Sequence, residues 1–284
     1  LAISVALAVA GFEKPEILND CAGFAGYQAT NPLFPCLFVT IACGIISGFH
    51  ATQSPIVART CRSEREARAT FFGMMVAEGV IAMIWAAAAL AIYNLEPENL
   101  SLAGPLVLGN IAKRFLGPWM GGVTVAAIVV LAITSGDTAL RSARLSLAEE
   151  LKVDQVDLKK RVLTCLPLAA VVIGLLAWSN RDAKSFSHLW NYFAWMNQLL
   201  STSMLFAATV WLLRLGRGWK ALVTLLPGVF MCLVITTFIF WAWPTKGQVW
   251  GIVPGGLPLP VAFAAAALVT AVAVVCVVRR GRRA

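Results

Sequence analysis

Apolar runs long enough to cross a membrane alternate with short polar connections along most of this chain. Apolar runs of about 20 residues are typical of transmembrane helices. The pattern predicts an all-α fold, a polytopic membrane helix bundle with seven full transmembrane helices, at about residues 33–58, 69–93, 118–140, 162–178, 186–213, 219–243 and 257–278. An amphipathic stretch at 106–115 predicts a short surface or re-entrant helix.

The apolar run at residues 1–10 is too short to span a bilayer as a helix. No basic segment precedes it, so a signal peptide is a poor interpretation of this run. We interpret it as a truncated transmembrane helix, and we therefore expect the chain to be the C-terminal part of a longer protein.

Two of the predicted spans contain polar, helix-breaking stretches. Residues 45–59 read IISGFHATQSPIVAR, and residues 133–144 read ITSGDTALRSAR. Such residues are costly at membrane depth unless they line a cavity or contact a neighbouring helix. Paired interrupted helices are typical of transporter binding sites. The pattern therefore predicts two broken helices, of the kind found in inverted-repeat transporters, that frame a transport site.

The composition excludes an ordinary soluble domain. Of the 284 residues, 59% are hydrophobic and 13% are charged, with a mean hydropathy of +0.78, whereas soluble domains carry charges at about 25% of positions. The net charge of +9 does not indicate a nucleic-acid partner, because the basic residues gather in connections at 59–68, 141–161, 214–220 and 279–283. These alternate with connections poor in basic residues, so the positive-inside rule places them and the C-terminus in the cytoplasm.

The motifs of common enzymes and metalloproteins are missing from the sequence. The seven cysteines are scattered, without the spacing of a metal site or a disulfide framework. No phosphate-binding loop, nucleophile elbow or HExxH motif is present, so the sequence does not indicate an enzyme. We predict no cofactor and no metal. The expected partners are a small-molecule substrate, protons and the lipid bilayer.

The first polar stretch supplies half of the candidate site residues, in the cytoplasmic half of an inward-running span. They are Ser47, Gly48, His50, Thr52 and Gln53. His50 would act as a proton-sensitive group or as a hydrogen-bond donor to substrate, or it would bond to a carbonyl of a neighbouring helix. Thr52 and Gln53 would line the same cavity, or they would hydrogen-bond between helices.

Glu78 is the most isolated charge of the chain, about nine residues past the start of the second predicted span. Ionisable residues inside membrane spans are candidates for proton relays. Glu78 is therefore a candidate proton carrier. The alternative is a structural role, as the partner of His50 or Arg141 on an adjacent helix.

The second polar stretch adds Ser135, Asp137, Thr138 and Arg141 to the candidate site. Hydroxyl and carboxylate oxygens at a broken helix would suit a cation or a protonation step. Arg141 would hold a carboxylate, together with Arg144 one turn later, or both would be ordinary positive-inside anchors. Four polar residues of the fifth predicted span have a spacing compatible with helix packing and are not assigned to the site: His188, Asn191, Asn197 and Gln198.

Three blocks of the sequence resemble the carbon starvation protein A (CstA) family. They are GIISGFHATQSPIVAR at 44–59, FFGMMVAEGVIAMIWAAAA at 71–89 and ITSGDTALRSARLSLAE at 133–149. The resemblance implies a partial CstA-type transporter core at 1–161 and C-terminal transmembrane helices of the same membrane domain at 162–284. It also implies that His50, Gln53, Glu78, Asp137 and Arg141 belong to the functional site.

The resemblance implies a function as well. We expect a proton-coupled secondary active transporter in the bacterial inner membrane, which imports peptides or small carboxylates such as pyruvate during carbon starvation. The alternative is a membrane nutrient sensor or signalling partner without net transport, although the sequence carries no attached signalling domain. A channel is disfavoured, because no filter motif is visible.

Overall fold

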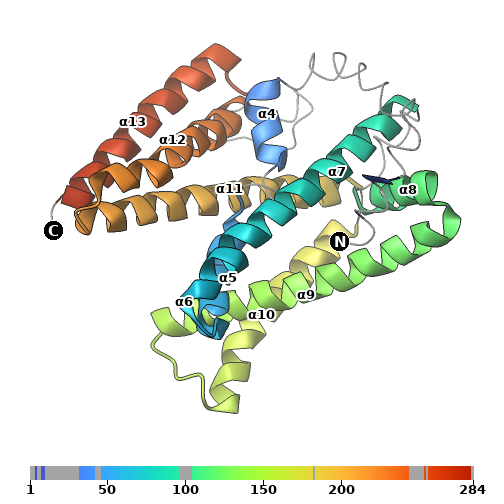
Figure 1. Cartoon of the computed structure of the whole chain (residues 1–284), viewed down its shortest axis with the longest axis horizontal. Coiled ribbons are helices and arrows are strands. Elements are labelled where there is room, and N and C mark those ends of the chain that lie inside the picture. Colours follow the sequence, from blue (N-terminus) through green and yellow to red (C-terminus); the bar gives the residue numbers. More distant parts are fainter. Residues whose placement is uncertain are drawn as a thin grey trace. The chain divides into compact units, whose positions relative to one another are not determined.

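The computed structural model describes residues 4, 8–9, 32–41, 46–95, 104–181, 183–242, 253 and 255–282. Within these residues the regular secondary structure is entirely helical, which confirms the predicted all-α class (Figure 1). The helices are α4 (Leu33–Thr40), α5 (Gly48–Thr60), α6 (Glu64–Ala67), the π-helix η3 (Arg68–Gly73), α7 (Met74–Leu95), α8 (Gly104–Leu116), α9 (Pro118–Glu150), α10 (Leu158–Ser179), α11 (Ala183–Arg214), α12 (Gly218–Trp241) and α13 (Leu259–Arg282). The prediction for residues 1–10 lies largely outside the described residues.

Six continuous helical segments of the described chain are long and apolar enough to cross a membrane. They are Glu64–Ala89, Pro118–Glu150, Leu158–Ser179, His188–Arg214, Gly218–Trp241 and Leu259–Arg282. Each matches a predicted span, and together they support a multi-pass membrane protein. The remaining predicted span, residues 33–58, is divided into α4 and α5. An interruption of this span is therefore confirmed, but most of the predicted stretch, from Gly48 to Arg59, is itself a continuous helix.

The second predicted break is wrong. Helix α9 passes through Ser135 and Gly136 without interruption and continues to Glu150, well into the predicted connection at 141–161. Polar side chains of the unbroken helix bond to its own backbone. The hydroxyl of Thr134 donates to the Leu131 carbonyl at 2.9 Å, and that of Thr138 donates to the Thr134 carbonyl at 3.0 Å. Such bonds satisfy a polar side chain inside a helix.

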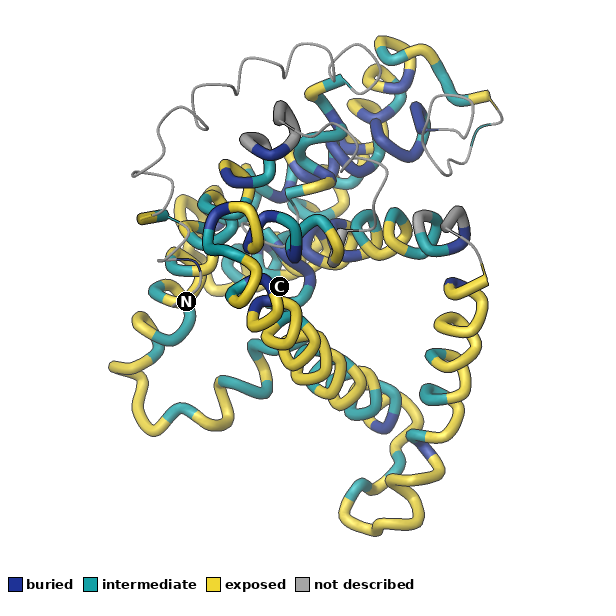
Figure 2. The backbone as a smooth tube through the Cα atoms, turned by 90° about the vertical axis from the view of Figure 1, so that its right-hand side faces the viewer, coloured by how far each residue is buried: buried dark blue, intermediate teal, exposed yellow. Residues whose placement is uncertain are grey.

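The first compact unit comprises Leu1–Ala29 and Ile56–Leu168. Helices α7 and α8 pack through a small core of Ala88, Ile92, Ile111 and Phe115. Helix α8 then turns into α9 at Gly117, whose φ of 87° is a conformation that glycine adopts readily. Many large apolar side chains of α9 remain exposed, as expected for a helix whose surface meets lipid. Figure 2 colours the backbone by burial and shows long exposed stretches of helix.

The second compact unit comprises Thr30–Pro55 and Ala169–Ala284. The short helix α4 packs against α11, α12 and the start of α13, in a core that includes Val39, Val234, Phe238 and Ala262. An aromatic cluster joins the same helices: the Phe38 ring meets the Phe230 ring edge-on, with centroids 4.9 Å apart. This packing fixes the position of α4, the first half of the broken span. The predicted domain division at residue 161 follows the family resemblance and stays a prediction.

Removing the Phe38 ring should destabilise the second unit. We expect Phe38→Ala to lower the free energy of unfolding by about 2 kcal/mol, because it leaves a cavity and breaks an edge-to-face aromatic pair. Thermal or denaturant unfolding in detergent micelles would measure the change. The matched control is Phe72→Ala, since the Phe72 ring is 63% exposed, and its effect should stay within about 0.5 kcal/mol. An equal loss in both variants would contradict this role for the cluster.

Candidate functional site

The interruption between α4 and α5 is the most unusual feature of the second unit. Helix α4 ends at Thr40 and α5 begins at Gly48, so the backbone of a membrane-length segment leaves the regular hydrogen-bond ladder. Ser47 and Gly48, both predicted site residues, are buried at the start of α5. In hydrocarbon, each backbone group that leaves the ladder needs another partner.

Helix α11 supplies a partner to the start of α5 through the side chain of Asn197. Its Oδ1 atom accepts a hydrogen bond from the Phe49 backbone N–H at 3.1 Å and one from the Ser47 hydroxyl at 3.2 Å. Asn197 is only 7% exposed. The Ser47 hydroxyl oxygen also accepts from the Phe49 N–H at 3.1 Å. The start of α5 is therefore capped jointly by its own preceding serine and by a different helix.

The next residue of α11 binds the other half of the broken span. Gln198, 1% exposed, donates from Nε2 to the Phe38 carbonyl in α4 at 3.1 Å. Its Oε1 accepts from the Ser201 hydroxyl at 3.2 Å. Two adjacent amides of one helix therefore hold both sides of the interruption, and we call Asn197 and Gln198 the amide clamp.

The bonds of the clamp residues agree with the predicted role in helix packing, and they join α11 to the ends of α4 and α5 that flank the break. The sequence does carry a signal for them: two neighbouring amides, Asn197 and Gln198, lie deep inside an apolar span. The sequence does not indicate their partners at the break, however, because Ser47, Phe49 and Phe38 lie roughly 150 residues away. Only the folded chain pairs them.

Gly48 allows α5 to approach α11 closely. A methyl group at this position would lie 2.5 Å from the Asn197 carbonyl oxygen and 2.8 Å from Cβ of Leu200. Neither neighbour is the free end of a flexible side chain. A glycine is therefore required here by close backbone approach, which is one of the reasons glycine is used inside helices.

The remaining predicted residues of the first stretch follow on α5. His50, Thr52 and Gln53 are half-buried within its first two turns. The Thr52 hydroxyl donates to the Phe49 carbonyl at 2.9 Å, and the Ser54 hydroxyl donates to the His50 carbonyl. Pro55 has no backbone N–H to donate to the Ala51 carbonyl one turn earlier, and these two hydroxyls bond to other carbonyls, those of Phe49 and His50. The structure thus places these predicted residues on one short helix that begins at the break.

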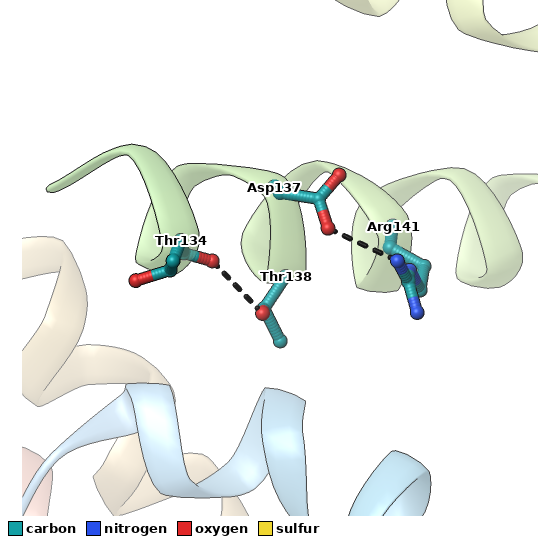
Figure 3. A network of polar contacts seen from close by, with 4 residues as sticks. All are labelled: Thr134, Asp137, Thr138 and Arg141. Atoms are coloured by element: carbon teal, nitrogen blue, oxygen red, sulfur yellow. Dashed lines mark hydrogen bonds and ion pairs between the residues drawn. The ribbon is translucent and has the colours of Figure 1, made fainter. Parts of the chain in front are cut away.

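The second stretch lies in the first unit, on the unbroken helix α9. Figure 3 shows Asp137 and Arg141 joined along its surface, with Arg141 Nη2 and Asp137 Oδ2 3.0 Å apart. Their side chains are 67% and 52% exposed. Ser135 and Thr138 are half-buried. The carboxylate and the guanidinium therefore neutralise each other at the usual i, i+4 helix spacing.

Two further charged residues of the first unit have positions that bear on their predicted roles. Glu78 is exposed on α7, and the ion-pair partner of Arg141 is Asp137. Arg144 donates to Gln155 Oε1 at 2.7 Å, and Gln155 Nε2 lies 3.5 Å from the Thr164 hydroxyl. Arg144 thereby links α9 to α10 through Gln155, and its two predicted roles stay predictions.

Comparison with known proteins identifies related sequences. A family profile described as carbon starvation protein CstA matches residues 1–107 and 107–238. An uncharacterized membrane protein of Haemophilus influenzae is 53% identical over 69 residues, which cover 24% of this chain and 18% of that protein. The peptide transporter CstA of Campylobacter jejuni is 27% identical over 147 residues, covering 50% of this chain and 21% of the transporter.

The name of a third relative gives a different substrate. The pyruvate/proton symporter BtsT of Escherichia coli is 37% identical over 81 residues, which cover 26% of this chain and 11% of the symporter. The chain thus spans about a fifth or less of the length of these three relatives. No solved structure matches the chain.

The two Ser-Gly steps should respond oppositely to a methyl group. We expect Gly48→Ala to destabilise the protein, because its Cβ would collide with Asn197 and Leu200. Gly136→Ala is the matched control, since open space surrounds Gly136 and alanine favours a helix interior over glycine by about 1 kcal/mol. Thermal unfolding in detergent compares the two variants. A Gly48→Ala protein as stable as Gly136→Ala would contradict the close approach of α5 to α11.

Proposed function

The chain belongs to the carbon starvation protein CstA family, and from that premise we propose that it forms part of a secondary active transporter for peptides or small carboxylates such as pyruvate. The names of the relatives support this proposal, because one is a peptide transporter and another a pyruvate/proton symporter. They do not favour a sensor without net transport, nor do they suggest an enzyme.

The observation that carries the proposal is the clamped break between α4 and α5. Transporters bind their substrates at discontinuous helices, where the N-terminal end of a half-helix faces the anionic group of the substrate. Helix α5 begins at such an end, and the buried amide of Asn197 holds that end against α11 by accepting from the Ser47 hydroxyl and the Phe49 N–H. Pyruvate and the C-terminus of a peptide share a carboxylate, so this one arrangement suits both.

In this proposal, each group of predicted residues has a separate task. Ser47, Gly48 and the first turns of α5, with His50, Thr52 and Gln53, receive the substrate carboxylate and its neighbouring polar groups. Glu78 carries the coupling proton, because Arg141 already engages the other candidate carboxylate, Asp137. Ser135 and Thr138 flank that ion pair on α9.

We further propose that the protein lies in the inner membrane with its basic connections and C-terminus in the cytoplasm. The basic connections at 59–68, 141–161, 214–220 and 279–283 alternate with less basic ones. Six continuous spans and the broken span together make seven crossings. This number agrees with the alternation that the positive-inside rule requires.

Loss of the amide of Asn197 should impair substrate binding at the break. We expect Asn197→Leu to raise KM for labelled pyruvate or a labelled dipeptide about tenfold, equivalent to about 1.4 kcal/mol, because the start of α5 loses the bonds that hold it in position against α11. Uptake into proteoliposomes measures this change. The matched control is Asn191→Leu on the same helix, which should leave KM unchanged. An equal rise of KM in both variants would contradict a specific role of Asn197, because any such substitution in α11 would then impair binding.

The proton assignment makes a separate prediction. We expect Glu78→Gln to abolish the accumulation of substrate driven by an inward pH gradient, while exchange of labelled for unlabelled substrate continues, because the amide cannot carry a proton. Proteoliposomes with an imposed gradient measure both activities. Glu149→Gln, a change of an exposed glutamate at the end of α9, is the control and should keep full accumulation. Full accumulation in Glu78→Gln would exclude Glu78 as the proton carrier.

A further inference from the structure

We infer that the end of the second unit where α11, α12 and α13 meet is a binding site for the headgroups of anionic phospholipids. Six exposed basic residues lie there, and we call them the basic end: Arg214, Arg217, Lys220, Arg279, Arg280 and Arg282. The inference concerns the surface of this unit and is independent of the transport proposal.

Packing between helices joins the two groups of basic residues, which are distant in the sequence. The Arg214 guanidinium donates from Nε and Nη2 to the Arg280 carbonyl, both at 3.4 Å. Gly281 is buried against the Leu213 side chain, with no room for a Cβ. The turn between α11 and α12 therefore lies beside the last turn of α13, near the C-terminus in Figure 1. The six cations form one surface.

No acidic side chain of the surrounding sequence balances these charges. Residues 183–284 contain no aspartate and no glutamate. The other two basic connections differ: 59–68 includes Glu64 and Glu66, and 141–161 includes four acidic residues. The positive-inside rule counts basic residues and is indifferent to acidic ones. It therefore explains why all four connections are basic, but it does not explain the excess of charge where the connections at 214–220 and 279–283 meet.

The helix dipole does not explain two of the cations either. Arg217 is the N-cap residue of α12 and Lys220 lies in its first turn, where no acidic residue is present. Positive charges are unfavourable at a helix N-terminus. An external anion at this place would relieve the repulsion among Arg217, Lys220 and the start of α12.

The surroundings of the basic end indicate that this anion is the headgroup of a lipid. Trp219 is 73% exposed between the basic residues, and the ammonium of Lys220 lies 5.7 Å from the centre of its ring. Exposed tryptophan is typical of the membrane interface, at the level of the headgroups. Leu215, in the same turn, is also exposed. A ligand that fits this surface has an anionic head beside an apolar tail, and clusters of basic residues next to a membrane span bind anionic lipids.

The experiment compares lipid retention by the purified protein. The protein is equilibrated in micelles with equal amounts of phosphatidylglycerol and phosphatidylcholine, and native mass spectrometry counts the lipids that stay bound. We expect phosphatidylglycerol to be retained preferentially. Arg217→Gln with Lys220→Gln should lower its retention about twentyfold or more, since each cation near a membrane surface contributes about a fivefold factor.

The matched control is Lys159→Gln with Lys160→Gln, which removes two cations from the connection that also carries acidic residues. It should leave retention unchanged. Arg279→Gln with Arg282→Gln repeats the test from α13, in case the α12 variant fails to fold. Equal retention of both lipids, an equal loss in the control, or displacement of phosphatidylglycerol by excess inorganic phosphate would each overturn the inference.

Discussion

The second unit depends on one constraint: backbone groups at a helix break inside a membrane must find hydrogen-bond partners. An unsatisfied group in hydrocarbon costs several kcal/mol, so an interrupted span is stable only where a neighbouring element replaces the missing ladder. Asn197 and Gln198 do this from adjacent positions on α11. The core around Val39 and Phe238 holds α4 against α11 and α12, so that the Gln198 amide meets the Phe38 carbonyl. Packing and polar satisfaction therefore support each other.

The same dipeptide, Ser-Gly, illustrates why a polar pattern alone does not predict a break. At Ser47–Gly48 the helix is interrupted, and at Ser135–Gly136 it is continuous. The difference lies in the surroundings. Gly48 touches the backbone of α11, whereas nothing lies within 4 Å of a Cβ at Gly136. A break forms where another helix offers partners to the freed backbone, and without them the i, i−4 ladder is the better choice.

Features that depend on residues close together in the sequence could be predicted, whereas contacts between residues far apart in the sequence could not. An apolar run shows that this segment of the chain can enter the lipid favourably. Such runs located six continuous spans and one interrupted span correctly. The length of α9 was underestimated, because a helix continues past the hydrocarbon as long as its own ladder is intact. The partners of Ser47 and Phe49 could not be predicted, since Asn197 lies about 150 positions away. Pairing at that separation is decided by tertiary packing.

The depth of each charge along its helix distinguishes the two carboxylates of the candidate site. Helix α9 has 33 residues, about 50 Å at 1.5 Å per residue, against a hydrocarbon core of about 30 Å. Asp137 lies about 28 Å from Pro118, so its ion pair with Arg141 is close to a membrane surface, where exposed charge costs little. Glu78 lies near the middle of the span Glu64–Ala89. A charge at that depth is costly, and this difference in depth is why Glu78, and not Asp137, is the proposed proton carrier.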